Sequence, residues 1–266
     1  QRQMCIRDSN EVDFLKDQSI EDCIIITENT CFYGESGGQV GDTGTIKSKN
    51  GKFLVTDTKK TPQGIFIHFG KLISGIINVG EDVDLSIDEE RRSLIMKNHS
   101  ATHLLHAALR NTLGNHVAQR GSLVNSEKLR FDFSHNKQIS SDDINKIQDE
   151  VNSVIKTSSK SNIEIKSQED AIKAGAIALF GEKYGDEVRV VTLGSKNDNP
   201  YSIELCGGTH VKDVTEINKF HIINEESVSS GVRRIEALTF KKVDEYISLK
   251  SKEKEKLEIR QNEDIN

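Results

Sequence analysis

Short apolar runs separated by glycine, asparagine and lysine turns dominate residues 20–87. Runs such as CIIIT and GIFIHFG have the length of strands, and they are rich in the β-branched and aromatic residues that favour strands. Because such runs recur about every ten residues, the pattern predicts a small barrel or a sandwich. The five predicted strands lie at 23–27, 39–46, 52–58, 64–70 and 82–88.

A long helix follows, and it begins at Asp88, whose side chain is a favourable N-cap. We expect it to end near Gly114, because glycine commonly follows the last residue of a helix. An apolar stripe with helical spacing runs along the segment, formed by Leu94, Ala101, Leu105, Ala108 and Leu109. His99 and His103 lie on the flank of this stripe, which predicts that both imidazoles are partly buried.

Strands and helices alternate in the rest of the chain. Strands are predicted at 117–124, 128–135, 162–166, 186–193 and 201–205, with two more within 219–238. Helices are predicted from Ser140 or Ser141 and over 168–176. The run from Lys241 onward is charged and has little apolar face, so it is predicted to be a connector helix.

These patterns predict an α+β protein with a β-rich domain at 10–88, a core at 89–240 and the connector helix at 241–266. Residues 1–9, QRQMCIRDS, show no periodicity and the chain does not begin with methionine. We interpret them as a non-native leader that stands outside the fold, and the chain as a fragment.

Four side chains carry the strongest chemical signal: His99 and His103 in NHSATHLLH, and Cys206 and His210 in ELCGGTHV. Residues four apart on a helix share a face, so the first pair presents two imidazoles together. The second pair is separated by two glycines and a threonine, which suits a turn round an ion. Three imidazoles and a thiolate are a good zinc set, and no glutamate lies inside the first pair as in an HExxH protease.

The role of such a zinc ion stays open at the sequence level. It could activate water, it could anchor a substrate group while another base acts, or Cys206 could be a nucleophile. The last option is the weakest, because a thiolate that is bound to a metal ion is less available to attack a substrate. Four protein ligands would also close a tetrahedron, whereas catalytic sites keep one position open.

The charge distribution favours an anionic partner. The chain has a net charge of −6, yet between Arg91 and Lys137 eight lysines and arginines face only two acids. A basic zone beside a metal site would attract an anionic substrate, although a solvated helix face is the simpler explanation. With four cysteines and no CxxC motif we expect a reducing compartment, hence the cytoplasm. We expect neither a membrane nor DNA as a partner.

The glycine-rich segment FYGESGGQVGDTG, residues 32–44, matches neither GxGxxG nor a Walker loop, so it does not indicate a nucleotide site. Together with NHSATHLLHAALRNTLGNHVAQRGSLV, LRFDFSH, EKYGDEVRVV, IELCGGTHV and SGVRRIEAL, in that order, it resembles the editing region of alanyl-tRNA synthetase. The resemblance covers residues 25–240. It implies a small Gly-rich β-barrel followed by a two-layer α/β editing core, with Zn²⁺ held by the four residues named above.

The resemblance also implies an activity, namely hydrolysis of the ester in Ser-tRNA(Ala) and Gly-tRNA(Ala), with the tRNA(Ala) acceptor end as partner. Gln119 would lie in the amino-acid pocket and Arg233 near the tRNA terminus, and Gln119 and Cys206 are the candidate catalytic residues. Thr30 or Gln119 could recognise the serine hydroxyl. The basic zone adds three candidate tRNA contacts, Arg91, Arg92 and Arg120.

Several departures and alternatives accompany the resemblance. No segment resembles the class II aminoacylation motifs, so these residues should not form alanyl-adenylate, although the parent protein could be an alanine-tRNA ligase. Phe240 stands where the family pattern usually has glycine. A freestanding alanyl-tRNA editing protein is the closest alternative, and a tRNA-binding module with a purely structural zinc is another. The threonyl synthetase editing domain shares the metal motifs, but the Gly-rich segment argues against it.

Overall fold

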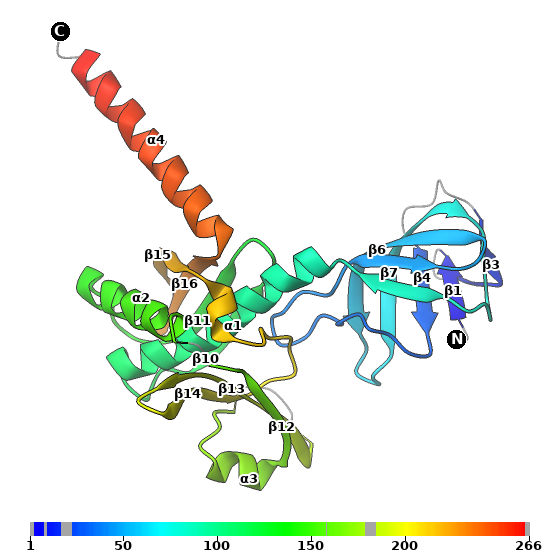
Figure 1. Ribbon diagram of the computed structural model, residues 1–266, viewed down its shortest axis with the longest axis horizontal. Helices are drawn as coiled ribbons and strands as arrows, with labels where there is room; N and C mark the ends of the chain where they lie inside the picture. The colour runs from blue at the N-terminus through cyan, green and yellow to red at the C-terminus, as the bar shows by residue number, and fades with distance from the viewer. Residues whose placement is uncertain (1–2, 8–9, 17–22, 158, 179–184, 264–266) are drawn as a thin grey trace. The chain divides into compact units, whose positions relative to one another are not determined.

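The structure is a computed structural model that describes residues 3–7, 10–16, 23–157, 159–178 and 185–263. It has two compact units. The N-terminal unit comprises residues 1–96, 123–126 and 207–209, and the core unit comprises the rest. Helices and antiparallel sheets occur together, which confirms the predicted α+β class. Figure 1 labels the elements along the chain.

The N-terminal unit is built on a seven-stranded antiparallel sheet. In sheet order its strands are β2 (Asn10–Val12), β1 (Gln3–Arg7), β4 (Cys23–Thr27), β7 (Phe66–Gly75), β6 (Gly51–Lys60), β5 (Gly44–Lys47) and β9 (Asp84–Ile87). The short strands β3 (Phe14–Leu15) and β8 (Ile77–Asn78) form a separate pair. Apolar side chains of this unit pack into one core, formed by Leu15, Cys23, Ile25, Phe32, Ile46, Phe53, Val55, Leu72 and Ile77.

One sequence prediction for this unit, the barrel, differs from the structure, and the segment interpreted as a leader contains a strand. Among the described residues the sheet does not close, since β2 and β9 are its edges, so the predicted barrel is not observed. The predicted leader also contributes to the sheet, because β1 pairs with both β2 and β4 through residues 3–7. Backbone pairing needs no apolar periodicity, which explains why the pattern gave no sign of this strand. Residues 1–2 and 8–9 of the predicted leader lie outside the described residues.

The glycine-rich segment is mostly loop, and of the strand predicted at 39–46 only the part from Gly44 is observed. Its backbone approaches neighbouring segments closely. A Cβ on Gly41 would lie 2.0 Å from the Thr58 carbonyl oxygen. The neighbouring Asp42 is buried, and its carboxylate accepts from the Tyr33 backbone N–H at 2.6 Å and pairs with Arg92. The loop is therefore held from inside by a buried ion pair.

The core unit contains most of α1 (Glu89–Leu113), which begins after Asp88 as predicted: the Asp88 carboxylate accepts from the Arg91 N–H at 2.9 Å. Its four-stranded sheet has the order β10 (Gln119–Val124), β11 (Leu129–Ser134), β16 (Val232–Thr239) and β15 (Phe220–Ser229). A three-stranded sheet has the order β12 (Asn162–Ser167), β13 (Glu187–Lys196) and β14 (Asn199–Leu205). The remaining elements are α2 (Ser141–Ile155), α3 (Gln168–Lys173), the 3-10 helix η1 (Val214–Ile217) and α4 (Lys241–Glu263).

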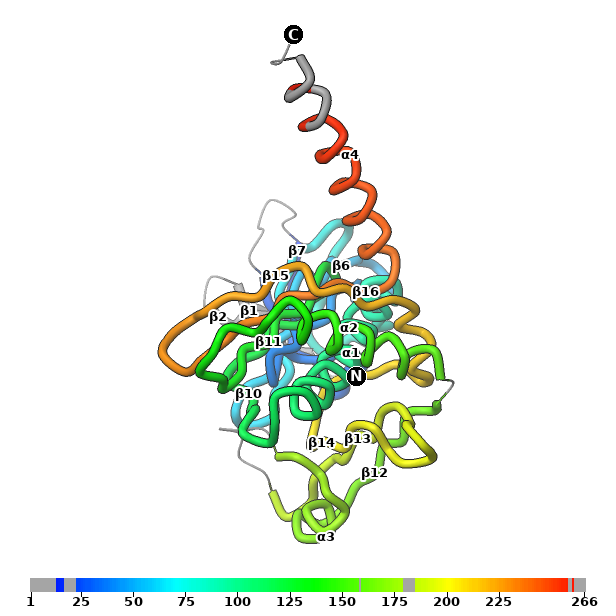
Figure 2. The backbone as a smooth tube through the Cα atoms, turned by 90° about the vertical axis from the view of Figure 1, so that its left-hand side faces the viewer, coloured from blue at the N-terminus to red at the C-terminus, as the bar shows by residue number. Residues whose placement is uncertain are grey.

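In both views of the core unit, α1 and α2 form a layer between the two sheets (Figures 1 and 2). Contacts of α2 with both β15 and β13 agree with this arrangement. The predicted two-layer core is thus extended by a second sheet, whose other face packs against α3. The apolar stripe of α1 explains its central place, because Ala101, Leu105, Ala108 and Leu109 are all fully buried.

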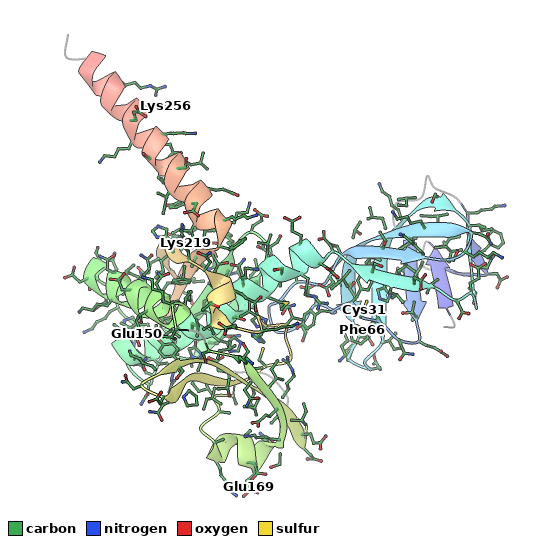
Figure 3. All side chains as sticks on the ribbon, in the orientation of Figure 1. Cys31, Phe66, Glu150, Glu169, Lys219 and Lys256 are labelled. Carbon is green, nitrogen blue, oxygen red and sulfur yellow. The ribbon has the colours of Figure 1, made fainter. Side chains whose placement is uncertain are left out.

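Helix α4 leaves the core unit as a projecting helix (Figure 2), and Lys256 in its outer half stands clear of the core (Figure 3). Its first turn is attached through the buried Val243 and an ion pair between Lys219 and Asp244 at 2.5 Å. The residue before the helix, Phe240, has φ of 53°, a left-handed conformation that glycine adopts more readily. No helix in the described part of the chain is both long and apolar enough to cross a membrane.

His68 provides a test of the N-terminal unit. Burial lowers the pKa of His68, while a hydrogen bond from its ring to the Ile25 carbonyl oxygen partly opposes this. The unfolded chain, with a histidine pKa of 6.5, therefore binds a proton more readily than the folded chain. We expect the stabilising contribution to be complete above this pH and to be lost below it, by up to about 1.4 kcal/mol per pH unit.

The measurement is the free energy of unfolding in denaturant as the pH falls from about 7.5 to about 5, for wild type and His68→Gln. Glutamine cannot gain the proton, so the variant should show a shallower decrease over this range. Equal decreases in the two proteins would contradict the assignment.

Candidate metal centre

The two sequence pairs meet in the interior of the core unit. His99, His103, Cys206 and His210 are all buried, and their donor atoms lie within 4.8 Å of one another. The Cys206 Sγ is 3.5 Å from His99 Nε2 and 3.4 Å from His210 Nε2. The rings of His99 and His103 have their centroids 5.2 Å apart, and those of His99 and His210 are 4.3 Å apart.

Local structure explains why these residues converge. His99 and His103 are one turn apart on α1, on the face that the helix buries. Cys206 directly follows β14, whose final residues are buried, and the short CGGTH turn returns the chain to place His210 beside it. Gly207 is exposed and a Cβ there would meet nothing within 4 Å, so this turn does not require glycine at that position for space.

Gln39 of the glycine-rich loop fixes the same turn within the N-terminal unit. This fully buried amide donates from Nε2 to the Thr209 hydroxyl and accepts the Thr209 backbone N–H, both at 2.9 Å. Two hydrogen bonds to one residue define its orientation. The glycine-rich loop and residue 209 are thus joined within the N-terminal unit.

Ser100 holds the outer side of His210. The Ser100 Oγ lies 3.2 Å from His210 Nδ1 and also accepts the backbone N–H of Val211 at 3.1 Å. The Ser100 hydroxyl thus contacts Nδ1 of the His210 ring. The other ring nitrogen, Nε2, faces Cys206.

Electrostatics within the cluster favour a thiolate. Burial alone would raise the pKa of Cys206, but the neighbouring His99 and His103 lower it well below its ordinary value. Burial would likewise lower the pKa of His103, but the charges of Glu204 and Cys206 outweigh it and raise the pKa to about 10. For His210 burial dominates, with a further contribution from His99, and lowers the pKa to about 3.

A buried carboxylate, Glu204, lies directly behind the cluster. Its Oε2 is 3.1 Å from His103 Nδ1, and its Oε1 is 3.0 Å from Nδ1 of a further buried histidine, His106. Ser202 donates its hydroxyl to the same Oε1 at 3.3 Å. Burial would raise the pKa of Glu204, yet the two histidines hold it well below its usual range.

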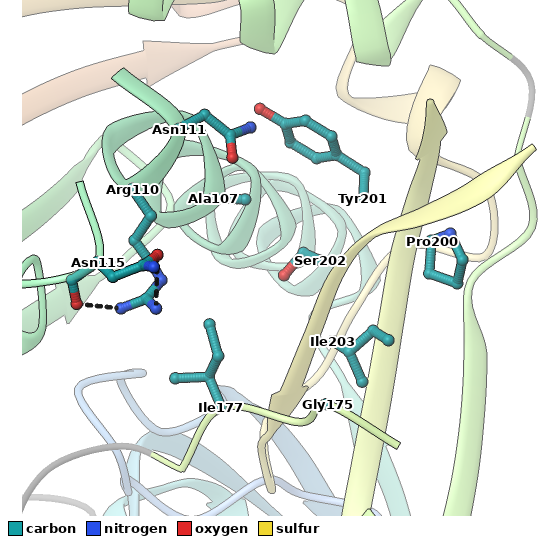
Figure 4. Close-up of a pocket in the computed structure, with 10 residues that line it drawn as sticks. All are labelled: Ala107, Arg110, Asn111, Asn115, Gly175, Ile177, Pro200, Tyr201, Ser202 and Ile203. Carbon is teal, nitrogen blue, oxygen red and sulfur yellow. Dashed lines mark hydrogen bonds between the residues drawn. The ribbon is translucent and has the colours of Figure 1, made fainter. Parts of the chain in front are cut away.

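A cavity of about 230 Å³ lies beside this carboxylate, between the C-terminal half of α1 and β14 (Figure 4). Ser202 lines it together with polar side chains such as Arg110, Asn111 and Tyr201. The Arg110 guanidinium donates to the carbonyl oxygens of Asn115 and Val117, and this fixes its position at the cavity wall. No sequence pattern had indicated this cavity.

The other predicted site residues of the core unit lie on its four-stranded sheet. Gln119 is the first residue of β10 and is half-buried, and Arg120 beside it is exposed. Arg233 on β16 forms a bidentate ion pair with Glu225 on β15, at 2.5 and 2.7 Å. Its charge is therefore already shared with a carboxylate.

Thr30, Arg91 and Arg92 belong to the N-terminal unit. The Thr30 hydroxyl accepts the Phe32 N–H at 3.1 Å and lies 2.8 Å from His68 Nε2. Arg91 donates to the Gly41 carbonyl oxygen at 2.8 Å, and Arg92 makes the buried ion pair described above. Both arginines thus fasten the glycine-rich loop.

The donor set fits a zinc ion. Zn–S and Zn–N bonds of about 2.3 and 2.0–2.1 Å in a tetrahedron separate sulfur from nitrogen by about 3.5 Å. The two Cys206 distances given above agree with this value. Burial of one soft thiolate among imidazole nitrogens also selects zinc over the oxygen-seeking cations.

Sequence reasoning missed the contacts that surround the ligands. Glu204 is on β14 and lies two residues before Cys206, which directly follows the strand, so extended backbone directs the two side chains to the same side. His106 follows His103 by three residues on α1, and therefore lies on the same side of the helix. These two spacings were the available signal.

Comparisons with known proteins agree with the motifs. The family model for class II (A) tRNA synthetases matches residues 3–91, and the model for the threonyl and alanyl tRNA synthetase second additional domain matches residues 188–236. An alanine--tRNA ligase of Sphingopyxis alaskensis is 53% identical over 82% of this chain and 25% of its own length. Ligases of Chelativorans and Nitrobacter winogradskyi are 51% and 50% identical, over 82% and 88% of the chain.

The chain is therefore similar to proteins of the aminoacyl-tRNA synthetase class. It is similar to the editing region of alanyl-tRNA synthetase, as its motifs predicted. It spans about a quarter of the length of the curated relatives that it matches.

Removal of the thiolate tests the metal centre. Cys206→Ala eliminates the charged ligand, so we expect the zinc content to fall from about one ion per chain to near zero. Metal analysis after dialysis against zinc and then buffer gives the result. Cys31→Ala, which changes an exposed cysteine of the N-terminal unit, is the matched control and should retain the wild-type content. Full zinc content in Cys206→Ala would rule out the assigned ligand set.

Proposed function

We propose that this chain hydrolyses the ester bond of serine or glycine wrongly attached to tRNA(Ala), in the cytoplasm, as the editing part of an alanine-tRNA ligase. The observation that carries the proposal is the buried cluster of His99, His103, Cys206 and His210 in a chain similar to alanine--tRNA ligases. A zinc ion bound by these residues would supply a Lewis acid that polarises the ester or anchors a substrate group.

A need for such a reaction follows from the physics of recognition. A pocket that fits alanine cannot strongly exclude glycine, which lacks one methyl group, or serine, which adds one hydroxyl. Discrimination of this kind is worth roughly 1–3 kcal/mol, so a second, hydrolytic selection is required for accuracy.

Other residues of this chain would bind the amino acid and the tRNA acceptor end. Gln119 would hydrogen-bond the amino acid and, with its half-buried amide, orient the ester. Thr30 is a second candidate for the serine hydroxyl, because its oxygen accepts only the Phe32 N–H and keeps one lone pair. Arg233, Arg91, Arg92 and Arg120 are the proposed contacts to the tRNA acceptor end, of which Arg120 is exposed.

A deacylation assay tests the proposal. We expect Ser-tRNA(Ala) and Gly-tRNA(Ala) to lose their amino acid in the presence of the protein, and Ala-tRNA(Ala) to be spared. Cys206→Ala, or chelation of the metal, should abolish hydrolysis while circular dichroism shows that the fold persists. Equal rates on serine and alanine esters would contradict an editing function.

A second candidate is a tRNA-binding module whose zinc is purely structural. The favouring observation is that four protein donors already complete a tetrahedral set. This candidate predicts tRNA binding with no hydrolysis of any ester, and loss of the folded state on chelation. A freestanding editing protein would behave as in the first proposal, and the length of the native gene product would identify it.

The salt dependence of tRNA binding tests the basic zone. Arg120→Ala removes one exposed cation, so affinity should fall and the slope of log affinity against log salt should decrease by about one. Lys173→Ala, on α3 and paired with Glu169, is a matched loss of one positive charge and should leave the slope unchanged. Identical slopes for wild type and Arg120→Ala would show that this arginine is only a solvated surface residue.

A further inference from the structure

We propose that Glu204 is the charge-balancing residue of the metal centre, and that His106 and Ser202 hold its carboxylate in position. The inference rests on the metal site of the proposed function, but not on the hydrolytic activity. It assigns a role to two buried ionisable residues, Glu204 and His106, that are not among the four candidate ligands.

The first argument is the position of the carboxylate. Glu204 is 3% exposed, so solvent does not compensate its charge. Its Oε2 stands 3.1 Å from Nδ1 of His103, one of the four candidate ligands. This contact is not a well-aligned hydrogen bond, since Nδ1 has no hydrogen-bond partner of good geometry among the described residues. The carboxylate therefore acts on the ligand through its charge.

The second argument is a charge count. A divalent cation bound by one thiolate and three neutral imidazoles leaves a net charge of +1 in a buried site. An isolated buried charge is costly, and a nearby opposite charge reduces that cost. Glu204 contributes the single negative charge that makes the assembly neutral. Arg189, which donates to the Cys206 carbonyl oxygen at 2.7 Å, is only half-buried, so solvent screens its positive charge more effectively.

The third argument is the anchoring of the other carboxylate oxygen. The Oε1 of Glu204 accepts from His106 Nδ1 at 3.0 Å and from the Ser202 hydroxyl at 3.3 Å. His106 is itself fixed by burial and by its contact with Phe131, with ring centroids 5.2 Å apart. Two donors on Oε1 orient the carboxylate so that Oε2 faces His103. His106 is thus a positioning residue that acts through Glu204.

The experiment compares zinc affinity in Glu204→Gln and wild type, by competition with a chromogenic chelator. Glutamine keeps the shape of the side chain and removes its charge, so we expect the zinc dissociation constant to rise by about 10- to 100-fold. His106→Gln, which removes one anchor but leaves the carboxylate, should raise it by a smaller factor. The spectrum of bound Co²⁺ should keep its tetrahedral form in Glu204→Gln, because the four ligands are unchanged.

Glu150→Gln is the matched control. Glu150 is also a carboxylate of the core unit with several partners, Asn111, Lys196 and Tyr201, but it contacts none of the ligands in the described structure. Its zinc affinity should equal that of wild type. An equal effect of Glu150→Gln would show that loss of any carboxylate weakens binding through the fold, and would overturn the proposal.

The outcomes separate this inference from the proposed function. If the wild-type chain takes up no zinc, the metal part of the proposed function fails together with the inference. If wild type binds zinc and Glu204→Gln binds it within about twofold as tightly, only the inference fails. Should Glu204→Gln not fold, Glu204→Asp decides: its shorter side chain cannot reach His106 and His103 together, so affinity should fall several-fold. Wild-type affinity in Glu204→Asp would overturn the inference.

Discussion

Burial of several ionisable groups at one point is the constraint on which the core unit depends. Burial removes four polar side chains from water, namely His99, His103, Cys206 and His210. Each of them needs a polar neighbour or a bound cation to replace the lost hydration. The fold meets this demand with a surrounding set of polar contacts rather than with apolar packing alone. Helix α1 lies between the two sheets, where His99 and His103 are buried together with its apolar residues.

Sequence periodicity predicted most elements of the fold because they bury one regular face. The helix after Asp88 and the strands of the second half are observed close to their expected bounds. The open sheet and β1 could not be predicted, since strand pairing is a matter of backbone hydrogen bonds between distant segments. The four ligand candidates were recognisable from spacing and residue type. Glu204 was not, because one carboxylate among the mixed polar and apolar residues of β14 has no periodic signature.

Charge counting along the sequence was a poorer guide than ligand spacing. It treats every arginine as available to an anion, whereas in the structure Arg92 forms an ion pair with Asp42 and Arg233 forms one with Glu225. Such pairs stiffen loops and strands, and a substrate phosphate would have to compete with a carboxylate that is already in place. A basic stretch in a sequence therefore sets an upper limit on the charge that a surface offers to RNA.

The left-handed conformation of Phe240 has a mechanical consequence. A helix of 23 residues is about 34 Å long, so a change of about 10° at its base moves its far end by about 6 Å. Glycine at this pivot would allow a broad range of backbone angles, whereas a side chain with a Cβ narrows that range. Phe240 also lies under the ammonium group of Lys97, 4.9 Å from the ring centroid, which adds a second restraint. The pivot at the base of helix α4 is therefore stiffer than it would be with glycine at position 240.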